Sequence, residues 1–418
     1  MRLDVLDLRT LSEDDFPRWV RALRTGFLRC EEVTEEEIGL RRGGVDLERT
    51  RGAFDGDRCV ATFRTLPQRL TVPGGASVVS CAVTNVTVSA THRRRGLLTR
   101  MMTDALAEGK ERGDVCSTLD SAEYPIYGRF GYGPATETAD WTVDVHRTGL
   151  DRRRPVPEEK GARIDPAEGA EVRVEGAALH ERVRALPDRQ GMVDRGERWW
   201  KLYTGELRWP GDRERPFHVL HRDAAGRVQG LATYTTDDHW ENNAPSVNLH
   251  VRDLIAATPE AERDLWHHLL SVDWIATVHT GNRAPDDLLP DLLPNARAAR
   301  LRTRTDFLWL RPLDVPALLA ARAYPVPASL VLDLHDPMGL AGGRFLLDAS
   351  PEGASCSPTT RSADLSMGVD ALGSLYLGDQ PASRLRALGR VVEERPGAAA
   401  LADVLFRTAR RPWCPDEF

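Results

Sequence analysis

Residues 83–102 read VTNVTVSATHRRRGLLTRMM, and this stretch decides how the N-terminal third of the chain is interpreted. Its first residues are rich in β-branched side chains, which is typical of a strand. A short polar connection leads to three consecutive arginines and Gly96. From Gly96 to about residue 112, apolar side chains recur at helical spacing. The stretch therefore predicts a strand, a basic turn and an amphipathic helix in series.

A helix that begins directly after a basic turn has the properties of a phosphate site. Its first turn leaves about four backbone N–H groups without partners in the helix, and the helix dipole favours an anion there. Gly96 would let a diphosphate approach the backbone closely, and the arginines would add positive charge. Coenzyme A fits this description, because it carries a pyrophosphate and its pantetheine amides can pair with an open strand edge at Val86, Thr87 and Val88.

The basic turn is also compatible with a simpler role. Three arginines before a helix can form an exposed, solvated patch that binds no ligand. Among the rival phosphate motifs, the GxxxxGK[ST] loop is absent from the sequence, and no GxGxxG follows an expected strand. The sequence therefore favours a coenzyme A site over a nucleoside triphosphate held by a Walker loop.

The surrounding residues predict three units in a chain of 418 residues. Residues 1–150 contain an expected helix near residues 13–29, two strands separated by the turn Pro73-Gly74-Gly75, the helix from Gly96 and a further strand near residues 115–122. This order is typical of an α/β unit with a mixed sheet.

The rest of the chain divides into a linker and two further units. Residues 151–165 carry prolines and charge runs, so we interpret them as a linker at the start of a second unit, residues 151–301. A strand near residues 247–258 and a helix near residues 259–273 repeat the strand-then-helix plan without its RRRG turn. Residues 302–418 have the pattern of an α+β domain.

Composition and charge exclude several classes of protein. Hydrophobic residues at 41% and charged residues at 28% are typical of a folded globular chain. A net charge of −7 argues against a nucleic-acid binder and mildly favours a cationic partner. No apolar run approaches the ~18 residues of a membrane span. The six cysteines occur singly, which disfavours a zinc site or a disulfide scaffold and predicts a cytoplasmic protein.

Two strings in the sequence resemble a known family. Arg93 and Gly96 match the acyl-CoA loop pattern [Q/R]xxGx[G/A] of the GNAT acetyltransferase superfamily, with Leu98 at the final small-residue position. The strings HRRRGLLT and IYGRFGYGPAT, at residues 92–99 and 126–136, more closely resemble the enhanced intracellular survival (Eis) family of N-acetyltransferases. The resemblance implies two GNAT-like mixed-sheet units, a sterol-carrier-like α+β C-terminal domain and assembly into a homohexamer.

The same resemblance implies which residues act. It implies Tyr127 as the proton donor and the α-carboxylate of Phe418, at the chain end, as the proton acceptor. Family members often have Ser-Glu-Gly-Gly before the tyrosine, where this chain has Ala122-Glu123-Tyr124-Pro125, so the side-chain contact at the first position differs. The acetyl-CoA contacts that the resemblance implies are Val86, Thr87, Val88, Arg94, Arg95, Gly96, Leu97, Leu98, Thr99, Ala122 and Glu123.

Acyl transfer to an amine needs a deprotonated amine, a polarised thioester carbonyl and a proton for the departing thiolate. Tyrosine, with an ordinary pKa of about 10, suits the donor better than the base. A terminal carboxylate, with an ordinary pKa of about 3.3–3.7, needs burial or a relaying water to act as the base, and Glu123 is the alternative.

The acidic residues at 31–37 either attract a cationic amine or form a solvated face. His92 and the pair His267-His268 lack metal-ligand spacing, so we expect no metal.

We therefore expect an acetyl-CoA-dependent N-acetyltransferase that acts on a cationic amine, and the resemblance implies aminoglycosides as the substrate class. The alternative is a carrier of lipids or other apolar ligands that uses the C-terminal domain, although a fold alone does not confer that function. A nucleic-acid-binding regulator would rest only on arginine patches, and we expect neither a nucleic-acid partner nor a membrane partner.

Overall fold

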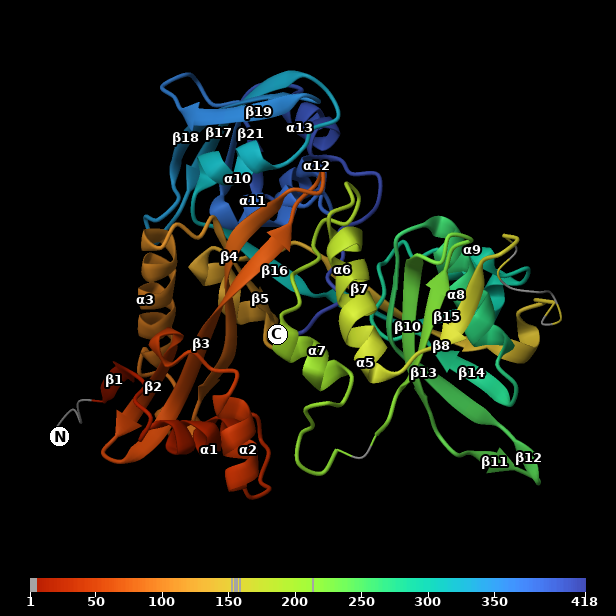
Figure 1. The fold of residues 1–418 in the computed structure, drawn as a ribbon. Coiled ribbons are helices and arrows are strands. Elements are labelled where there is room, and N and C mark those ends of the chain that lie inside the picture. Colours follow the sequence, from red (N-terminus) through yellow and green to blue (C-terminus); the bar gives the residue numbers. More distant parts are fainter. Residues whose placement is uncertain (1–5, 152, 154–156, 158, 213) are drawn as a thin grey trace.

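The computed structural model describes residues 6–151, 153, 157, 159–212 and 214–418. They form three sheet-based units (Figure 1). The first unit, in red and orange, carries the third unit, in blue, on one end of its sheet, and the second unit, in yellow and green, lies beside them (Figure 1). The expected class, two mixed-sheet units followed by an α+β unit, is confirmed.

The first unit is a sheet of seven strands in the order β1-β2-β3-β4-β5-β16-β6. The expected turn at Pro73-Gly74-Gly75 closes the β3–β4 hairpin, where both glycines have positive φ. Strands β4 and β5 are parallel, and helix α3 crosses between them. The bounds are β1 Asp7–Thr10, β2 Thr50–Asp55, β3 Arg58–Thr71, β4 Ser77–Val88, β5 Cys116–Asp120, β6 Gly133–Pro134, β16 Leu308–Pro312, α1 Phe16–Gly26, α2 Glu35–Arg42, α3 Leu97–Glu111 and α4 Tyr124–Tyr127.

The second unit repeats the parallel strand, helix, strand arrangement. Its sheet has the order β15-β7-β14-β13-β10-β9-β8, and helix α8 crosses between the parallel strands β13 and β14. A β-hairpin, β11 and β12, projects from it (Figure 1). The bounds are β7 Glu137–Asp144, β8 Arg163–Pro166, β9 Phe217–Arg222, β10 Val228–Thr236, β11 Trp240–Glu241, β12 Ala244–Pro245, β13 Val247–Ala256, β14 Ile275–His279, β15 Ala299–Asp306, α5 Gly169–Glu171, α6 Ala177–Arg184, α7 Glu197–Tyr203, α8 Pro259–Ser271 and α9 Leu289–Leu292.

Strands are exchanged between the units on both sides of the expected limits at residues 150 and 301. Strand β7 belongs to the second sheet although it lies before residue 150, and β15 runs across residue 301. Strand β16 then returns to the first sheet, between β5 and β6. Of the linker expected at residues 151–165, residues 152, 154–156 and 158 lie outside the described residues. Strand β8 begins at Arg163, within the expected linker. The limits 1–150, 151–301 and 302–418 therefore stay a prediction.

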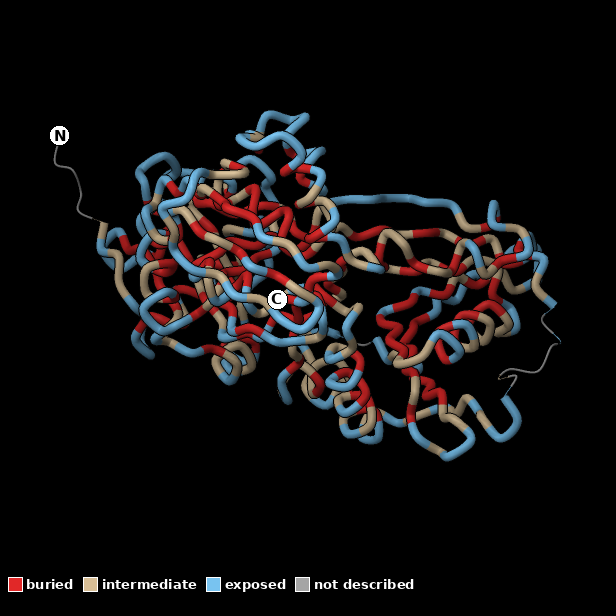
Figure 2. The backbone as a smooth tube through the Cα atoms, turned by 90° about the horizontal axis from the view of Figure 1, so that it is seen from above, coloured by how far each residue is buried: buried red, intermediate tan, exposed pale blue. Residues whose placement is uncertain are grey.

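The third unit covers the end of the first sheet. Helix α11 packs on β16 and β6, where a Cβ on Gly133 would overlap the carbonyl oxygen of Asp370. As a result the first and third units share one hydrophobic core, and Figure 2 shows buried residues concentrated inside each part of the molecule. The bounds are α10 Val315–Ala321, α11 Val369–Tyr376, α12 Ala382–Ala387, α13 Ala398–Phe406, β17 Ala328–His335, β18 Gly343–Ser350, β19 Gly353–Pro358, β20 Leu365–Gly368 and β21 Val391–Glu393.

Candidate active site

The basic turn before α3 leaves the start of that helix open to a ligand. Gly96 adopts a left-handed conformation with φ +77°, and Arg94 is also left-handed at φ +63°. Within the described residues no side chain caps α3, and its first turn has no acidic residue. A Cβ added to Gly96 would meet no atom within 4 Å, so the space beside the turn is free. The uncapped N–H groups and the helix dipole make this helix start suitable for an anion.

Strand β4 supplies an open edge beside the same helix. Strand β5 pairs with β4 only from Ser80 to Val83, whereas β4 continues to Val88. The backbone N–H of Ser89 donates to the carbonyl of Val60 on β3, over 2.8 Å. Because backbone groups alternate in direction along a strand, those of Val88 and Val86 face away from β3, toward the gap left by β5. An extended amide-bearing ligand can pair with them.

A cavity of about 540 Å³ lies between this strand edge and α3, which is within the usual size of a ligand pocket. It contains every predicted cofactor residue except Arg95, whose guanidinium donates instead to the carbonyl of Thr91 over 3.4 Å. The lining residues are Gly26, Phe27, Val86, Thr87, Val88, His92, Arg93, Arg94, Gly96, Leu97, Leu98, Thr99, Ala122, Glu123, Ile126, Tyr127 and Arg129.

Sequence reasoning missed the wall formed by the end of α1. Gly26 and Phe27 close the cavity on that side because Gly26 packs directly on the side chain of Thr87, where a Cβ would clash. A glycine at the end of an amphipathic helix is the sequence feature that marks such a close contact, but it does not reveal the partner. His92 also lines the cavity, and its ring is held by Asp55 at 3.2 Å and Thr91 at 2.8 Å.

Tyr127 lies at the end of α4 and lines the same cavity with 9% of the residue exposed. Burial raises its pKa to about 12, with contributions from the charges of Glu123 and Asp120. The phenol is therefore protonated at neutral pH and can act as a proton donor.

The turn after Tyr127 explains two glycines of the YGRFGYG string, Gly131 and Gly133. Gly131 has φ +82°, and Gly133 has no room for a side chain against α11. The buried Arg311 donates to the carbonyl of Phe130 over 2.6 Å and to Asp336 over 2.9 Å, so β16 and the third unit hold this turn in place. The position of Tyr127 therefore depends on residues from three separate parts of the chain.

The last residues of the chain come to the carboxyl end of β5, near the centre of the molecule (Figure 1). Burial raises the pKa of Asp120, the last residue of β5, to about 6, together with the negative charges of Glu417 and Asp306. Phe418 is half-buried against the core that the first and third units share, and it is not among the residues that line the cavity. The structure thus brings the tail to the strand that leads into Ala122 and Glu123, with the Phe418 ring outside the cavity.

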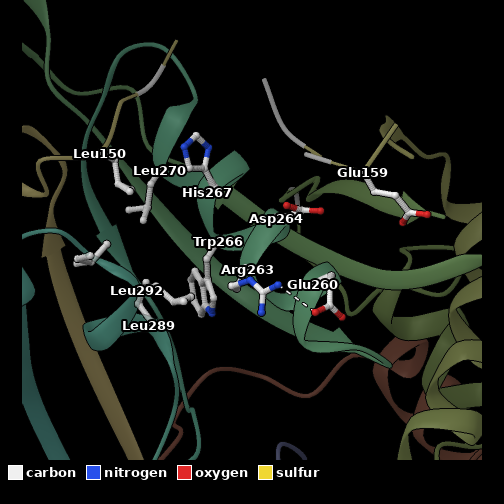
Figure 3. A pocket seen from close by; sticks show the side chains of 11 residues that line it. Leu150, Glu159, Glu260, Arg263, Asp264, Trp266, His267, Leu270, Leu289 and Leu292 are labelled. Carbon is white, nitrogen blue, oxygen red and sulfur yellow. Dashed lines mark hydrogen bonds and ion pairs between the residues drawn. The ribbon is translucent and has the colours of Figure 1, made fainter. Parts of the chain in front are cut away.

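The second unit has a cavity of its own beside α8, of about 220 Å³ (Figure 3). Leucines and Trp266 form its apolar side, and the ion pair of Arg263 with Glu260 lies at its charged side. The N-terminus of α8 is capped by Thr258, which accepts from the N–H of Ala261 over 3.2 Å, and two glutamates occupy its first turn. A capped, acidic helix start disfavours a phosphate, so the second unit repeats the strand and helix without a helix start suitable for an anion.

Comparisons with known proteins agree with this architecture. Residues 7–135 match an acetyltransferase (GNAT) domain family, residues 191–312 match a second acetyltransferase (GNAT) domain family, and residues 315–415 match a sterol carrier protein domain family. The fold and these matches define a GNAT-type N-acetyltransferase, an enzyme of the acyltransferase class.

Relatives that match along nearly the whole chain identify the family within this class of enzymes. An uncharacterized N-acetyltransferase of Streptomyces avermitilis is 54% identical over all of both chains. The N-acetyltransferase Eis of Mycobacterium tuberculosis is 34% identical over 95% of this chain and 97% of its own. The crystal structure of Eis1 from Mycobacterium abscessus superimposes with a TM-score of 0.84 at 32% identity, covering 99% of this chain and 100% of the other. The chain belongs to the Eis family of N-acetyltransferases.

Two further observations bear on ligands and location. Within the described residues, no group of three or more histidine, cysteine, aspartate or glutamate side chains is placed to hold a metal ion. None of the helices in the described part of the chain is long and apolar enough to cross a membrane.

Proposed function

We propose that this protein transfers the acetyl group of acetyl-CoA directly to an amine of a cationic acceptor, with aminoglycosides as the substrate class. The observation that supports this most strongly is the cavity in which the open start of α3, the free edge of β4 and Tyr127 meet. An uncapped helix start suits the pyrophosphate of coenzyme A and an open strand edge suits its pantetheine arm, and Tyr127 lines the same cavity.

In this proposal the pyrophosphate binds the turn and first residues of α3, at Arg94, Arg95, Gly96, Leu97, Leu98 and Thr99. Arg95 contributes through its backbone, since its side chain lies outside the cavity. The pantetheine amides pair with Val86, Thr87 and Val88, and the thioester lies near Ala122 and Glu123. Tyr127 donates a proton to the departing thiolate, and the α-carboxylate of Phe418 accepts the proton of the amine.

Negative charge around the carboxyl end of β5 supports a cationic acceptor. The negative charges of Glu417 and Asp306 contribute to the raised pKa of Asp120 there, and Glu123 lines the cavity. A group of carboxylates near a site attracts an ammonium group through its negative charge. The family name of the relatives supports acetylation, and this electrostatic feature supports the charge of the acceptor.

An amine panel tests the function. With acetyl-CoA, the protein should release coenzyme A when given aminoglycosides, and release should be at least ~10-fold slower with monoamines of similar size, because these lack the additional positive charges. The measurement is thiol release with product mass spectrometry. Release that is equally fast with the monoamines would refute the preference for a multiply charged acceptor, and no acetylated product with any amine would refute acetyl transfer.

Replacing Gly96 with valine should weaken acetyl-CoA binding by at least ~100-fold, because a β-branched residue is strained at positive φ and its side chain would enter the space beside the helix start. Gly113 provides the matched control. It has φ +84° and free space around its Cβ position, but it follows the other end of α3. Calorimetry should show near wild-type affinity for Gly113→Val; equal losses in both variants would mean that strain, and not the site, causes the effect.

We also propose that the protein works as a cytoplasmic homohexamer, on the basis of the family resemblance. The six free cysteines, of which four are buried, suit a reducing compartment. Light scattering would check the assembly, which should have six times the chain mass of 46.4 kDa.

The carrier function of the C-terminal domain is less favoured, because the full-length relatives are N-acetyltransferases.

A further inference from the structure

Arg195 lies where the first sheet, the second sheet and the C-terminal tail meet. Its side chain is only 2% exposed. Its Nη1 donates to Asp253 on β13 over 2.6 Å, and its Nε donates to Asp416 in the tail over 2.8 Å. The guanidinium also stacks over the ring of Trp199, 4.0 Å from its centre. One buried cation thus holds two carboxylates from distant parts of the chain.

The segment that carries Arg195 is itself fixed to the first sheet. The N–H of Thr71 donates to the carbonyl of Met192 over 2.9 Å, and the N–H of Arg69 donates to the side chain of Asp194 over 2.7 Å. With Asp253 on a central strand of the second sheet, the guanidinium has two rigid supports. The hydrogen bond from Arg195 therefore fixes the position of Asp416.

The tail is held at a second point a few residues earlier. Gln190 donates from Nε2 to the carbonyl of Arg410 over 2.6 Å and accepts from the N–H of Trp413 over 3.1 Å. Gly191, with φ +98°, packs so closely on Trp413 that a Cβ would lie 2.8 Å from its carbonyl oxygen. Cys414 and Asp416 are buried beyond this point. The tail therefore follows a defined path that ends at Arg195.

The distance from Asp416 to the chain end is short. Two residues span at most about 7 Å, so fixing Asp416 confines the α-carboxylate of Phe418 to a small volume. Among the described residues, Asp416 makes the charged hydrogen bond closest to the chain end, since Glu417 is exposed and Phe418 is half-buried by apolar packing. A loss of this contact would free the carboxylate while leaving every residue of the cavity in place.

Stability alone is a poor explanation for the cluster. A buried ion pair contributes little net stability compared with apolar residues of the same volume, because both charges lose their hydration. In addition, Oδ2 of Asp416 has no hydrogen-bond partner among the described residues, which adds to that cost. Directional hydrogen bonds from a planar guanidinium do, however, fix the position of a carboxylate well.

We propose that Arg195 is a positioning residue for acetyl transfer, which holds Asp416 so that the α-carboxylate of Phe418 stays at the carboxyl end of β5. This inference rests on the proposed role of the chain end as proton acceptor. It assigns a task in the reaction to a residue that does not line the cavity.

A pair of matched variants tests the proposal. Asp416→Ala and Asp253→Ala each leave Arg195 with one carboxylate, so both lose one buried charged contact, but only Asp416→Ala releases the tail. We expect Asp416→Ala to lower kcat by about 100-fold, because even a misplacement of about 1 Å can cost that much. Asp253→Ala should keep kcat within about threefold, because the segment of Arg195 stays bound to the first sheet through Met192 and Asp194. Both variants should keep the KM for acetyl-CoA within about threefold. Equal losses of kcat in the two variants would overturn the positioning role.

A second measurement follows the tail without using the reaction. A carboxypeptidase should release Phe418 at least ~10-fold faster from Asp416→Ala than from the wild type or Asp253→Ala, because local opening then requires less free energy. If the alanine variant does not fold, Asp416→Asn, which keeps the side-chain shape, replaces it in the same measurement. Unchanged release rates would overturn the anchoring. Faster release together with unchanged kcat would overturn the link to catalysis, and a wild type that acetylates no amine would refute the proposed function while leaving the anchoring measurable.

Discussion

Replacing Tyr127 with phenylalanine should lower kcat by about 10²- to 10⁴-fold, the usual contribution of a general acid. The hydroxyl group is lost while the ring, which packs edge-on against Tyr132 at 6.2 Å, keeps its place. Acetyl-CoA affinity should change by less than about threefold, because a proton donor acts mainly in the transition state. Steady-state kinetics and calorimetry on the same preparation measure the two quantities.

Tyr124 provides the control on the same short helix. It is 57% exposed and contacts Trp309 edge-on at 4.9 Å, and it does not line the cavity. Tyr124→Phe should keep kcat within about twofold, the size of effect expected away from the reacting atoms. Unchanged kcat in Tyr127→Phe would leave Tyr127 with a packing role alone.

The raised pKa of Tyr127 gives the prediction a pH dependence with a definite sign. Because burial raises this pKa to about 12, the phenol stays protonated through the neutral and mildly alkaline range. The wild-type rate should therefore show no alkaline loss attributable to Tyr127 below about pH 11, one unit under that value. A fall of kcat near pH 10 that is absent in Tyr127→Phe would contradict the buried donor.

The part of the site that the sequence predicts best is the part built from neighbouring residues. The strand, the turn at Gly96 and helix α3 follow one another along the chain, so β-branched residues, a glycine with φ +77° and helical periodicity are sufficient to predict them. The β3–β4 hairpin is predicted for the same reason, since its turn residues carry the conformation themselves.

Contacts between distant residues account for what the sequence does not reveal. Strand β16 joins the first sheet nearly 200 residues after β5, and the pairing depends on burial on both sides and not on any local pattern. The packing of Gly26 on Thr87 and the hydrogen bonds of Arg195 with Asp253 and Asp416 are of the same kind. Each residue is ordinary by itself, and its role is defined only by the partner that the fold brings to it.

Extending the chain past Phe418 should lower kcat by at least ~100-fold, because it converts the proposed proton acceptor into a neutral amide and moves the new carboxylate away. Two added glycines leave every native side chain unchanged. The tail should remain anchored, since Asp416 and the residues before it keep their partners. Acetyl-CoA should bind normally, because Phe418 is not among the residues that line the cavity.

The matched control separates the carboxylate from the side chain. Phe418→Leu keeps the α-carboxylate and an apolar group against the shared core, so it should retain kcat within about threefold. If the extended chain and the leucine variant lost activity equally, apolar packing of the last residue would be the requirement, and the carboxylate would not be the base. If the extended chain turned over at the wild-type rate, Glu123 would be the remaining carboxylate in the cavity, and Glu123→Gln should then lower kcat instead. Because the chain-end base requires a free α-carboxylate and the glutamate base does not, the extension distinguishes the two proton acceptors by itself.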